Sequence, residues 1–544
     1  MLRQESLDLS REEIARDPVP NHRTGYVHCN HQNDALDQSK ADSPCNCQHR
    51  LGNLETGKNE ERDHEDDGSP DTNGGDPLFK FWDVLTEEVA KDCHCANDQQ
   101  DTCDLAQDLP EVMRRVCLSV LGHRADSQES MRCERAGGQP DQEGTAYNSG
   151  MSANDHLDFY RLDDLLTSQE KSLVDTVARW VDSSFLPRVN DFWSEGLMPA
   201  EILLELGSLG VLGASIDGYG CPGLSARASG TIMRELERGD SGLRTFASVQ
   251  GSLAMKAIHL FGDESQRQQF LPGLARGELC GCFGLTEPSA GSNPGAMATV
   301  AVRDGSDWVI NGVKKWIGSA DIATVAVVWA QVLEQGDPKG IRGFLVDTQL
   351  PGYSAHLMNN KLSLRCGRTC MVELDSVRVP AESLLPGSEV GLRAPLTCLD
   401  HARFGIAWGV IGAAQACFSE VLAYTQERIS FDRALASYQL VQDKLARNLG
   451  EITRSQLIAS RLAELMDSSE VIGEHISLAK YSNVESAQRV ARTSRELLGG
   501  VGILDDHASL RHMINLESVS TYEGTRDVHR LVLGRWLTGM QAFR

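Results

Sequence analysis

Residues 517–537 read ESVSTYEGTRDVHRLVLGRWL, and the rest of the chain is interpreted around Glu523-Gly524 near the centre of this stretch. Thr525 is a good N-cap and Asp527 suits a first helical turn, so a helix is expected to begin here. Apolar residues follow at helical spacing: Val528, Leu531, Val532, Trp536 and Leu537. Glu523 is therefore expected at a tight corner between two helices. An isolated Glu-Gly-Thr is more often an ordinary exposed turn, and only the rest of the chain reverses that interpretation.

The chain has 544 residues, enough for two or three domains, and is acidic, with a net charge of −25. This charge argues against nucleic acid or an anionic membrane surface as the main partner. No apolar run of membrane-spanning length is evident, and the first residues have no signal core. We expect a soluble protein of a bacterial-type cytoplasm. In a eukaryote the mitochondrial matrix is the alternative, although the acidic start is not a clear transit peptide.

Residues 1–152 differ in composition from everything that follows. They are rich in Asp, Glu, Asn, Gln and Ser, so they bury little core, and a disordered, cysteine-containing extension is expected. The sequences CNCQH (45–49) and CHC (93–95) raise a zinc interpretation. Their spacings do not match the paired clips of structural zinc sites, and no metal site is predicted. A wrongly assigned translation start is the other alternative.

The remaining chain divides into three segments with different periodicity. Residues 153–279 are helical in pattern, residues 280–390 consist of short β-branched stretches between Gly, Asp and Pro turns, and residues 391–544 return to long amphipathic stretches. The expected order is helices, then a β-domain, then a helical bundle.

Four short motifs lie in these segments. FGLTEPSAGSNPGAM (283–297) and WIGS (316–319) fall in the β-domain, whereas RISF (428–431), followed by Gln439, and ELLGGVG (496–502) fall in the helical bundle. An Arg such as Arg428 can bridge pyrophosphate oxygens through both arms of its guanidinium. The ELLGGVG glycines alone are weak evidence, because most such glycines end helices, and no βαβ unit surrounds them.

Together, the motifs and the order of segments resemble the acyl-CoA dehydrogenase family of flavoenzymes from about residue 155 to the end. The resemblance implies an α+β multidomain fold with an N-terminal helical domain, a middle β-barrel domain and a C-terminal four-helix bundle. It implies FAD as the cofactor, contacted at Phe283, Leu285, Thr286, Ser292, Trp316, Ser319, Arg428, Phe431, Gln439, Glu496, Gly499, Gly500, Thr525, Asp527 and Phe543. A plain helix cap explains Thr525 and Asp527 equally well. Arg428, Phe431 and Gln439 are expected to reach the FAD of a neighbouring subunit in a homotetramer.

Glu523 falls where most members of this family place the catalytic base. A thioester α-proton is a very weak acid, so its removal requires hydrogen bonds to the thioester carbonyl as enolate charge develops. The Glu523 backbone N–H and a flavin ribitol hydroxyl are expected to donate them. A carboxylate whose pKa is raised by desolvation then removes the proton, and the β-hydride passes to the flavin.

The stretch ELERGDSGLRTFASVQ (235–250) resembles the glutaryl-CoA dehydrogenases within the family. In that subfamily an Arg, helped by a Glu and a hydroxyl, holds the distal carboxylate of the glutaryl chain; Arg244, Glu237 and Thr245 fall at these positions. A buried acyl pocket accepts a carboxylate only beside a paired cation. In isolation, Arg244 is as readily a surface cation. The same likeness implies substrate contacts from Ser292, Arg403, Tyr522 and Gly524.

The resemblance thus implies oxidation and decarboxylation of glutaryl-CoA to crotonyl-CoA and CO2, as in lysine and tryptophan degradation, with electrons passed to electron-transfer flavoprotein. Tyr522 is the residue type found beside the base in decarboxylating members. Several positions depart from the pattern: Thr245 for Ser, Gly318 for a flavin-contacting Thr, Asn293 for Asp, Asp432 for Gly, and Asp400-His401 for two Asn.

Two other interpretations stay open. A short-chain aliphatic acyl-CoA dehydrogenase or an acyl-CoA oxidase would share the flavin motifs but has no need of Arg244. A non-catalytic protein that has kept the fold would lack bound FAD.

Overall fold

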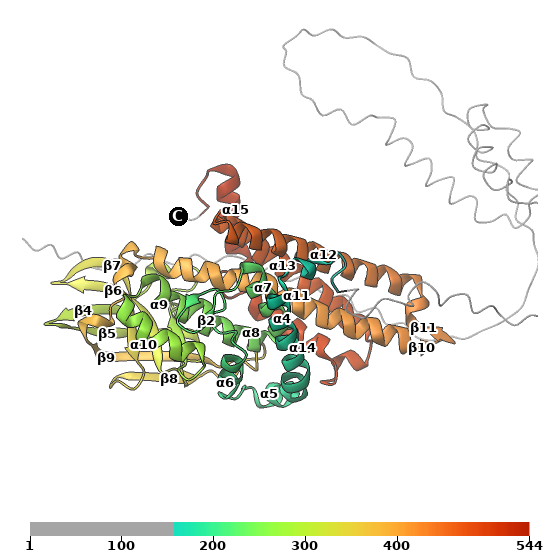
Figure 1. Cartoon of the computed structure of the whole chain (residues 1–544), viewed down its shortest axis with the longest axis horizontal. Coiled ribbons are helices and arrows are strands. Elements are labelled where there is room, and N and C mark those ends of the chain that lie inside the picture. Colours follow the sequence, from blue (N-terminus) through green and yellow to red (C-terminus); the bar gives the residue numbers. More distant parts are fainter. Residues whose placement is uncertain (1–156, 543–544) are drawn as a thin grey trace, which may run out of the picture. The chain divides into compact units, whose positions relative to one another are not determined.

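The structure is a computed structural model that describes residues 157–542 (Figure 1). The predicted extension over residues 1–152, with its cysteine and histidine motifs, and Phe543 lie outside the described residues. Within the described part, helices are followed by a β-sheet and then by a helical bundle, which confirms the predicted fold class.

The N-terminal helical domain begins with helices that have side-chain caps. Thr167 and Glu170 form a reciprocal capping box at α4, Ser225 accepts from Ala228 at the start of α7, and Asp240 accepts from Gly242 at the start of α8. The helices are α4 (Ser168–Trp180), α5 (Val189–Glu195), α6 (Ile202–Ser208), α7 (Ala226–Gly239), α8 (Ser241–Ser248), α9 (Lys256–Phe261) and α10 (Glu264–Ala275). A small hairpin, β1 (Asp217–Gly218) with β2 (Cys221–Pro222), precedes α7.

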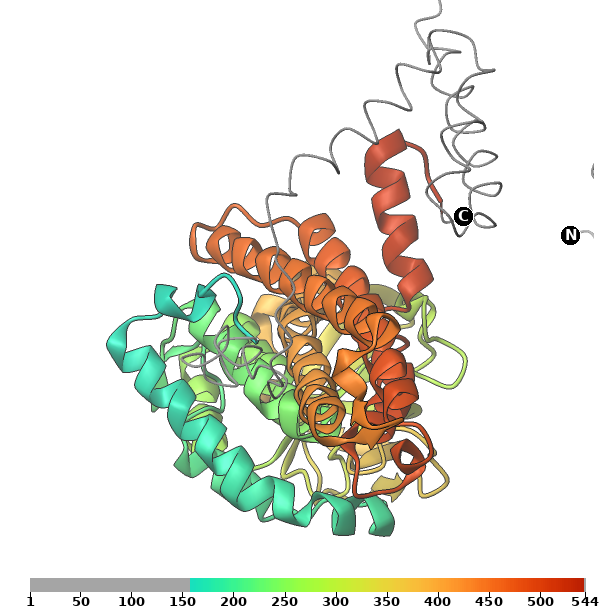
Figure 2. The same ribbon diagram turned by 90° about the vertical axis from the view of Figure 1, so that its right-hand side faces the viewer.

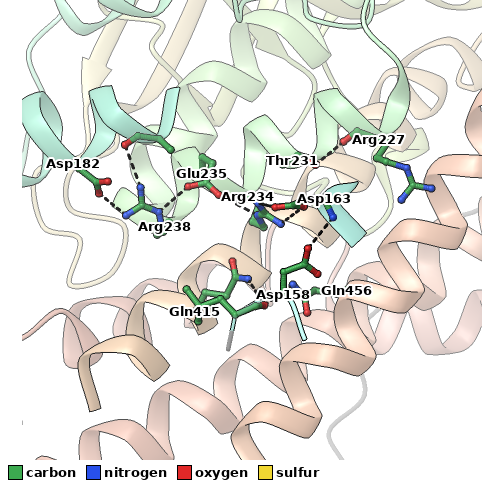
Figure 3. Close-up of polar contacts among 12 residues, drawn as sticks. Asp158, Asp163, Asp182, Arg227, Thr231, Arg234, Glu235, Arg238, Gln415 and Gln456 are labelled. Atoms are coloured by element: carbon green, nitrogen blue, oxygen red, sulfur yellow. Dashed lines mark hydrogen bonds and ion pairs between the residues drawn. The ribbon is translucent and has the colours of Figure 1, made fainter. Parts of the chain in front are cut away.

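A polar network fixes the first described residues against α7 and the bundle (Figure 3). The guanidinium of Arg234, on α7, binds both carboxylate oxygens of Asp163 at 2.9 and 2.7 Å and also contacts Glu235. Gln415 and Gln456 donate to the Leu157 carbonyl at 3.0 and 2.8 Å. Arg234 is buried, so the paired carboxylates compensate the cost of burying its charge.

The β-domain is one seven-stranded sheet in the order β3-β6-β4-β5-β9-β8, with β7 paired to β6. This path of hydrogen-bonded strands does not close on itself within the described residues, so the sheet is a half-barrel. The strands are β3 (Gly281–Gly284), β4 (Val300–Asp304), β5 (Asp307–Gly318), β6 (Val325–Glu334), β7 (Asp337–Asp347), β8 (Tyr353–Leu357) and β9 (Thr369–Val379). The sheet and the N-terminal helices share one apolar core.

The C-terminal bundle has a second apolar core. Its helices are α11 (Arg393–Glu427), α12 (Gln439–Asp467), α13 (Gly473–Leu497), α14 (Ala508–Val519) and α15 (Arg526–Thr538). A short hairpin, β10 (Ile429–Ser430) with β11 (Arg433–Ala434), joins α11 to α12 at the end of the bundle opposite the sheet (Figure 1).

Two details differ from the sequence-based expectations. First, α11 is long and apolar enough to cross a membrane by length and composition, but 72% of its most apolar window is buried inside the protein, as in a core helix. Second, the apolar stripe of α15 is not buried in this chain: Leu531, Trp536 and Leu537 are 41%, 58% and 73% exposed. Figure 2 shows α15 projecting away from the rest of the bundle.

Candidate active site

Glu523 lies at the predicted corner, between α14 and α15. The N–H groups of Thr521 and Tyr522 both donate to the Ser518 carbonyl, which ends α14, and the Thr525 hydroxyl caps α15 by accepting from the Val528 N–H at 3.2 Å. Between these caps the chain turns sharply, with a left-handed φ of 54° at Glu523 and 97° at Gly524. A non-glycine residue in this conformation is strained, and such strain concentrates at functional sites.

Arg244 lies beside this corner and is fully buried. Its Nε donates to Glu237 Oε2 at 2.7 Å, and one terminal nitrogen donates to the Tyr522 hydroxyl. The Thr245 hydroxyl lies 3.3 Å from the same Tyr522 oxygen, and Ser241, which sequence reasoning missed, donates to Glu237 Oε1 at 2.8 Å. The second terminal nitrogen of Arg244 is buried and has no partner among the described residues. Four predicted substrate residues therefore meet in one cluster.

The pKa of Arg244 stays above its usual value. Burial alone would lower the pKa, but the carboxylate of Glu237 and the nearby Tyr522 and Glu523 raise it by more. The guanidinium therefore remains charged at any working pH. Burial also raises the pKa of Tyr522 despite the opposing charge of Arg244, so its hydroxyl is a neutral donor and acceptor.

Two further cations hold the backbone of the corner. Arg403 Nε donates to the Glu523 carbonyl at 2.8 Å, and Arg403 also pairs with Asp400 at 2.8 Å. Lys480, on α13, donates to the carbonyls of Tyr522 and Gly524 at 2.9 and 2.7 Å. Sequence reasoning predicted Arg403 but missed Lys480. The available signal was a lysine on the apolar face of α13, between Ile476 and Val484.

The Glu523 carboxylate is suited to accepting a proton. Burial raises its pKa, while Arg244, Lys480 and Arg403 lower it by smaller amounts. Its Oε2 is enclosed and has no hydrogen-bond partner within residues 157–542. The Glu523 N–H also donates to no acceptor in that part of the chain, so it is free to bind an external carbonyl oxygen. A basic oxygen and a free donor thus belong to one residue.

Trp316 lies in the β-domain at an irregularity of β5. Lys315 pairs with Met371 and Ile317 with Cys370, so Trp316 is an extra, bulged residue with a φ of 67° and a side chain that is 56% exposed. Ser319, just beyond, is buried, with a φ of 61°. An added Cβ at Gly318 would lie 2.9 Å from a methyl group of Val249, so a Thr at this position would require Val249 to move.

The other β-domain positions surround the end of β3. Phe283 and Leu285 are buried, and the Thr286 carbonyl accepts from the Lys315 N–H at 2.8 Å. Ser292 is exposed in the loop that follows. The described contacts do not join any of these residues to the Glu523 cluster.

Arg428, Phe431 and Gln439 are remote from that cluster within one chain. They lie at the β10–β11 hairpin and the first residue of α12, at the far end of α11 from Arg403 (Figure 1). Arg428 and Gln439 are exposed, and Phe431 is 90% exposed. At 1.5 Å per residue, the helix from 403 to 427 separates the two regions by about 36 Å.

Glu496, Gly499 and Gly500 lie where α13 ends. Gly499 has a left-handed φ of 63°, and its N–H donates to the Glu496 carbonyl at 3.0 Å, as in an ordinary helix terminus. A Cβ added at either glycine would meet open space, so a ligand has access to this backbone. Asp527, on the first turn of α15, is exposed and near Arg526 and Arg530.

Comparison with known proteins identifies the family. Models of the acyl-CoA dehydrogenase N-terminal, middle and C-terminal domains match residues 167–278, 282–377 and 389–538. Human mitochondrial short-chain specific acyl-CoA dehydrogenase is 31% identical over 369 residues, which cover 68% of this chain and 90% of that protein. The chain belongs to the acyl-CoA dehydrogenase family.

Two solved structures are informative. A glutaryl-CoA dehydrogenase from Mycobacterium smegmatis, in complex with FADH2, is 48% identical, with a TM-score of 0.69, and the match covers 72% of this chain and 99% of that one. Butyryl-CoA dehydrogenase from Megasphaera elsdenii is 27% identical, with a TM-score of 0.65, over 68% of this chain and 98% of that one.

Proposed function

We propose that this protein is an FAD-dependent acyl-CoA dehydrogenase that oxidises and decarboxylates glutaryl-CoA. The observation that carries the proposal is the second terminal nitrogen of Arg244, which is buried and has no partner within residues 157–542. The other terminal nitrogen donates to Tyr522, the residue next to Glu523. Glu237 already uses the Nε of this guanidinium and Tyr522 one terminal nitrogen. The remaining donor is suited to a substrate carboxylate, which a purely aliphatic acyl chain does not carry.

In this proposal Glu523 removes the α-proton of the thioester. Its enclosed Oε2 accepts the proton, and its free N–H donates to the thioester carbonyl as negative charge develops there. Arg244 anchors the far end of the acyl chain, so the α-carbon is held within reach of the base.

The residues fit FAD, which when bound supplies the acceptor for the β-hydride. Trp316 offers an exposed indole at a bulge, and Arg428 and Phe431 project from the hairpin. The exposed Ser292, the open turn at Gly499 and Gly500, and the start of α15 are the other groups that would hold it.

In this proposal the same cluster also carries out the decarboxylation. Once oxidation has placed a double bond conjugated to the thioester, the bond between the γ-carbon and the carboxylate breaks and CO2 leaves. The electron pair is delocalised onto the thioester carbonyl, where the Glu523 N–H stabilises it. The protonated Glu523 then returns its proton to the γ-carbon, which gives crotonyl-CoA.

The proposal includes electron-transfer flavoprotein as the acceptor and an assembly of at least two copies, up to a homotetramer. The distance between Arg428 and the Glu523 cluster supports an assembly, because a neighbouring copy can bring this hairpin to the cofactor. The exposed apolar side chains of Leu440, Trp536 and Leu537 also support an assembly, because a neighbouring copy can bury them.

The second candidate is a short-chain aliphatic acyl-CoA dehydrogenase, which the likeness to the human short-chain enzyme favours. The test measures turnover by the full-length FAD-loaded enzyme with glutaryl-CoA and with butyryl-CoA, using an artificial electron acceptor while following CO2 and acyl-CoA products. Arg244→Ala is the test variant. Arg238→Ala is the matched control, because Arg238 is also an ion-paired arginine of this region but bonds Asp182 and Glu235 instead of Tyr522.

We expect crotonyl-CoA with an equal amount of CO2, and a loss of about a hundredfold or more in kcat/KM for glutaryl-CoA in Arg244→Ala alone. Glutaconyl-CoA without CO2 would keep the pocket assignment and reject decarboxylation. If the enzyme turns over butyryl-CoA only, and Arg244→Ala does so as fast as the wild type, the second candidate would be established. Oxygen consumption would indicate an oxidase, and purified protein that cannot bind FAD would indicate a non-catalytic member.

A further inference from the structure

Three consecutive carbonyls at the corner each accept a hydrogen bond from a cationic side chain, the buried Lys480 or the partly buried Arg403. Lys480 Nζ binds the first and third, those of Tyr522 and Gly524, at 2.9 and 2.7 Å. Arg403 Nε binds the middle one, that of Glu523, at 2.8 Å. Lys480 is 1% exposed, so its position is set by the packing of α13 and not by solvent.

We propose that Lys480 is a positioning residue for the base, which it holds by clamping the carbonyls on both sides of Glu523 and by placing an uncompensated positive charge beside its carboxylate. This inference rests on the proposed role of Glu523 as the base and goes beyond it, because Lys480 bonds the backbone on both sides of Glu523 and not its carboxylate.

The clamp explains why Glu523 keeps a disfavoured conformation. A φ of 54° is unusual for a residue with a side chain, and surrounding structure has to determine it. With its carbonyls directed to Lys480 and Arg403, the corner leaves the Glu523 N–H without an acceptor in residues 157–542. One turn earlier on α13, Ser477 lies 3.1 Å from Nδ1 of His529, so the same helix also holds the start of α15.

The charge of Lys480 differs from the other charges around Glu523. Arg244 on α8 is paired with Glu237 on α7, and Arg403 on α11 is paired with Asp400. Lys480 forms no ion pair with a carboxylate of the described residues, and its two acceptors are neutral carbonyls. Burial lowers the pKa of Lys480 to about 7, and the charge of Glu523 opposes this shift.

His529, the remaining titratable side chain of this corner besides Tyr522, stays neutral above acidic pH, since burial lowers its pKa to about 3. Removing the charge of Lys480 should therefore raise the pKa of Glu523 further. The carboxylate form would then be reached only at higher pH.

The test follows flavin reduction by glutaryl-CoA and by butyryl-CoA in anaerobic single turnover between pH 5 and 9, with full-length holoenzyme. The variants are Lys480→Met, which removes charge and donors, Lys480→Gln, which removes the charge but keeps donors, and Lys480→Arg, which keeps both. Lys361→Met is the matched control. Lys361 likewise bridges two backbone carbonyls, those of Leu364 and Gly367, but lies in the β-domain.

We expect Lys480→Met to slow flavin reduction about tenfold or more at pH 7. The acid limb of the plot of rate against pH, where Glu523 becomes protonated, should move to higher pH by about half a unit or more. Lys480→Gln should show the same shift of the limb with a smaller loss of rate, which keeps the test decisive if the Met variant does not fold. Lys480→Arg should restore the limb. Lys361→Met should lower thermal stability but leave the acid limb of the pH-rate profile where it is in the wild type.

An unchanged acid limb in both neutral variants, or an Arg variant as defective as Met, would overturn the inference. Glu523→Gln separates the two proposals. If Glu523→Gln reduces the flavin at the wild-type rate, the proposed base is wrong. If Glu523→Gln is inactive while the neutral Lys480 variants keep the wild-type profile, only the role of Lys480 is wrong.

Discussion

The residue pair Glu523-Gly524 combines strain with close packing. Glu523 adopts its left-handed conformation beside a glycine whose φ of 97° no other residue adopts easily. A Cβ added at Gly524 would lie 2.8 Å from Nε2 of the buried His529. The geometry of the carboxylate therefore depends on a neighbour that has no side chain.

Gly524→Ala should destabilise the protein by about 2 kcal/mol or more, because it adds backbone strain to a contact with His529. Urea unfolding of the holoenzyme measures this loss, and flavin reduction should slow in parallel. Gly534→Ala is the control, in the interior of α15, the helix that follows the corner, where a Cβ meets open space. It should be neutral or stabilising by about 0.5–1 kcal/mol. Equal effects of the two substitutions would contradict this account.

At this scale the sequence predicted the residues that carry a recognisable pattern. The Thr525 cap, the corner at Glu523 and the cluster of Glu237, Arg244 and Thr245 were all expected, and the structure joins that cluster to Tyr522. Lys480 was missed because its partners are backbone carbonyls more than forty positions away in sequence, and carbonyls leave no trace in residue type.

Among the elements, helix α11 packs against α7 and lines one side of the Arg244 cluster. Gly409, in the middle of α11, faces the ion pair, and a Cβ there would lie 2.1 Å from Glu237 Oε2 and 3.2 Å from Arg244 Nε. Gly412, three residues further, would meet the Arg234 carbonyl at 1.9 Å. The two helices approach closely because α11 has glycine at these positions.

Gly409→Ala should separate Glu237 from Arg244 and lower kcat/KM for glutaryl-CoA by about tenfold or more, with a smaller effect on butyryl-CoA. Gly405→Ala, one turn earlier, is the matched control, since a Cβ there makes only ordinary contact with Met233 at 3.5 Å. Steady-state kinetics with both substrates measure the difference. An equal loss with both substrates would place the effect on folding instead of on the carboxylate pocket.

The elements also show why periodicity is an incomplete guide to burial. The pattern of Val528, Leu531, Trp536 and Leu537 predicted α15 correctly, but the stripe is largely exposed in a single chain. An apolar stripe indicates that something covers a helix, and the sequence does not specify whether the cover belongs to the same chain. The bulge at Trp316 was likewise not predictable, since it arises from the pairing of β5 with β9.

For the whole molecule, buried neutral histidines make stability depend on pH. His512 is fully buried, with no partner for either ring nitrogen within residues 157–542, and burial lowers its pKa to about 3. The unfolded chain, with a histidine pKa of about 6.5, then binds a proton that the folded protein does not. Stability from this residue is complete above about pH 6.5 and falls as the pH decreases towards 3.

We expect the unfolding free energy of the wild type to be lower at pH 5 than at pH 7.5, and His512 to account for about 2 kcal/mol of this decrease. In His512→Gln the decrease between these two values of pH should be smaller by that amount, even if Gln lowers stability overall. Urea unfolding of the wild type and the variant at both values of pH provides the comparison. Parallel pH dependences would show that His512 is not the group responsible.

The unbroken helix α11 carries Arg403 beside the base and delivers the chain to Arg428 and Phe431 at the hairpin. Because each residue of a helix advances 1.5 Å and turns about 100°, one residue inserted between these points would swing the hairpin to another side of the bundle. The number of residues in this helix is therefore strongly constrained, because any change in it would displace the hairpin from its position in the proposed assembly. Insertions and deletions should instead accumulate where a turn absorbs them, as at Gln335 and Gly336 between β6 and β7.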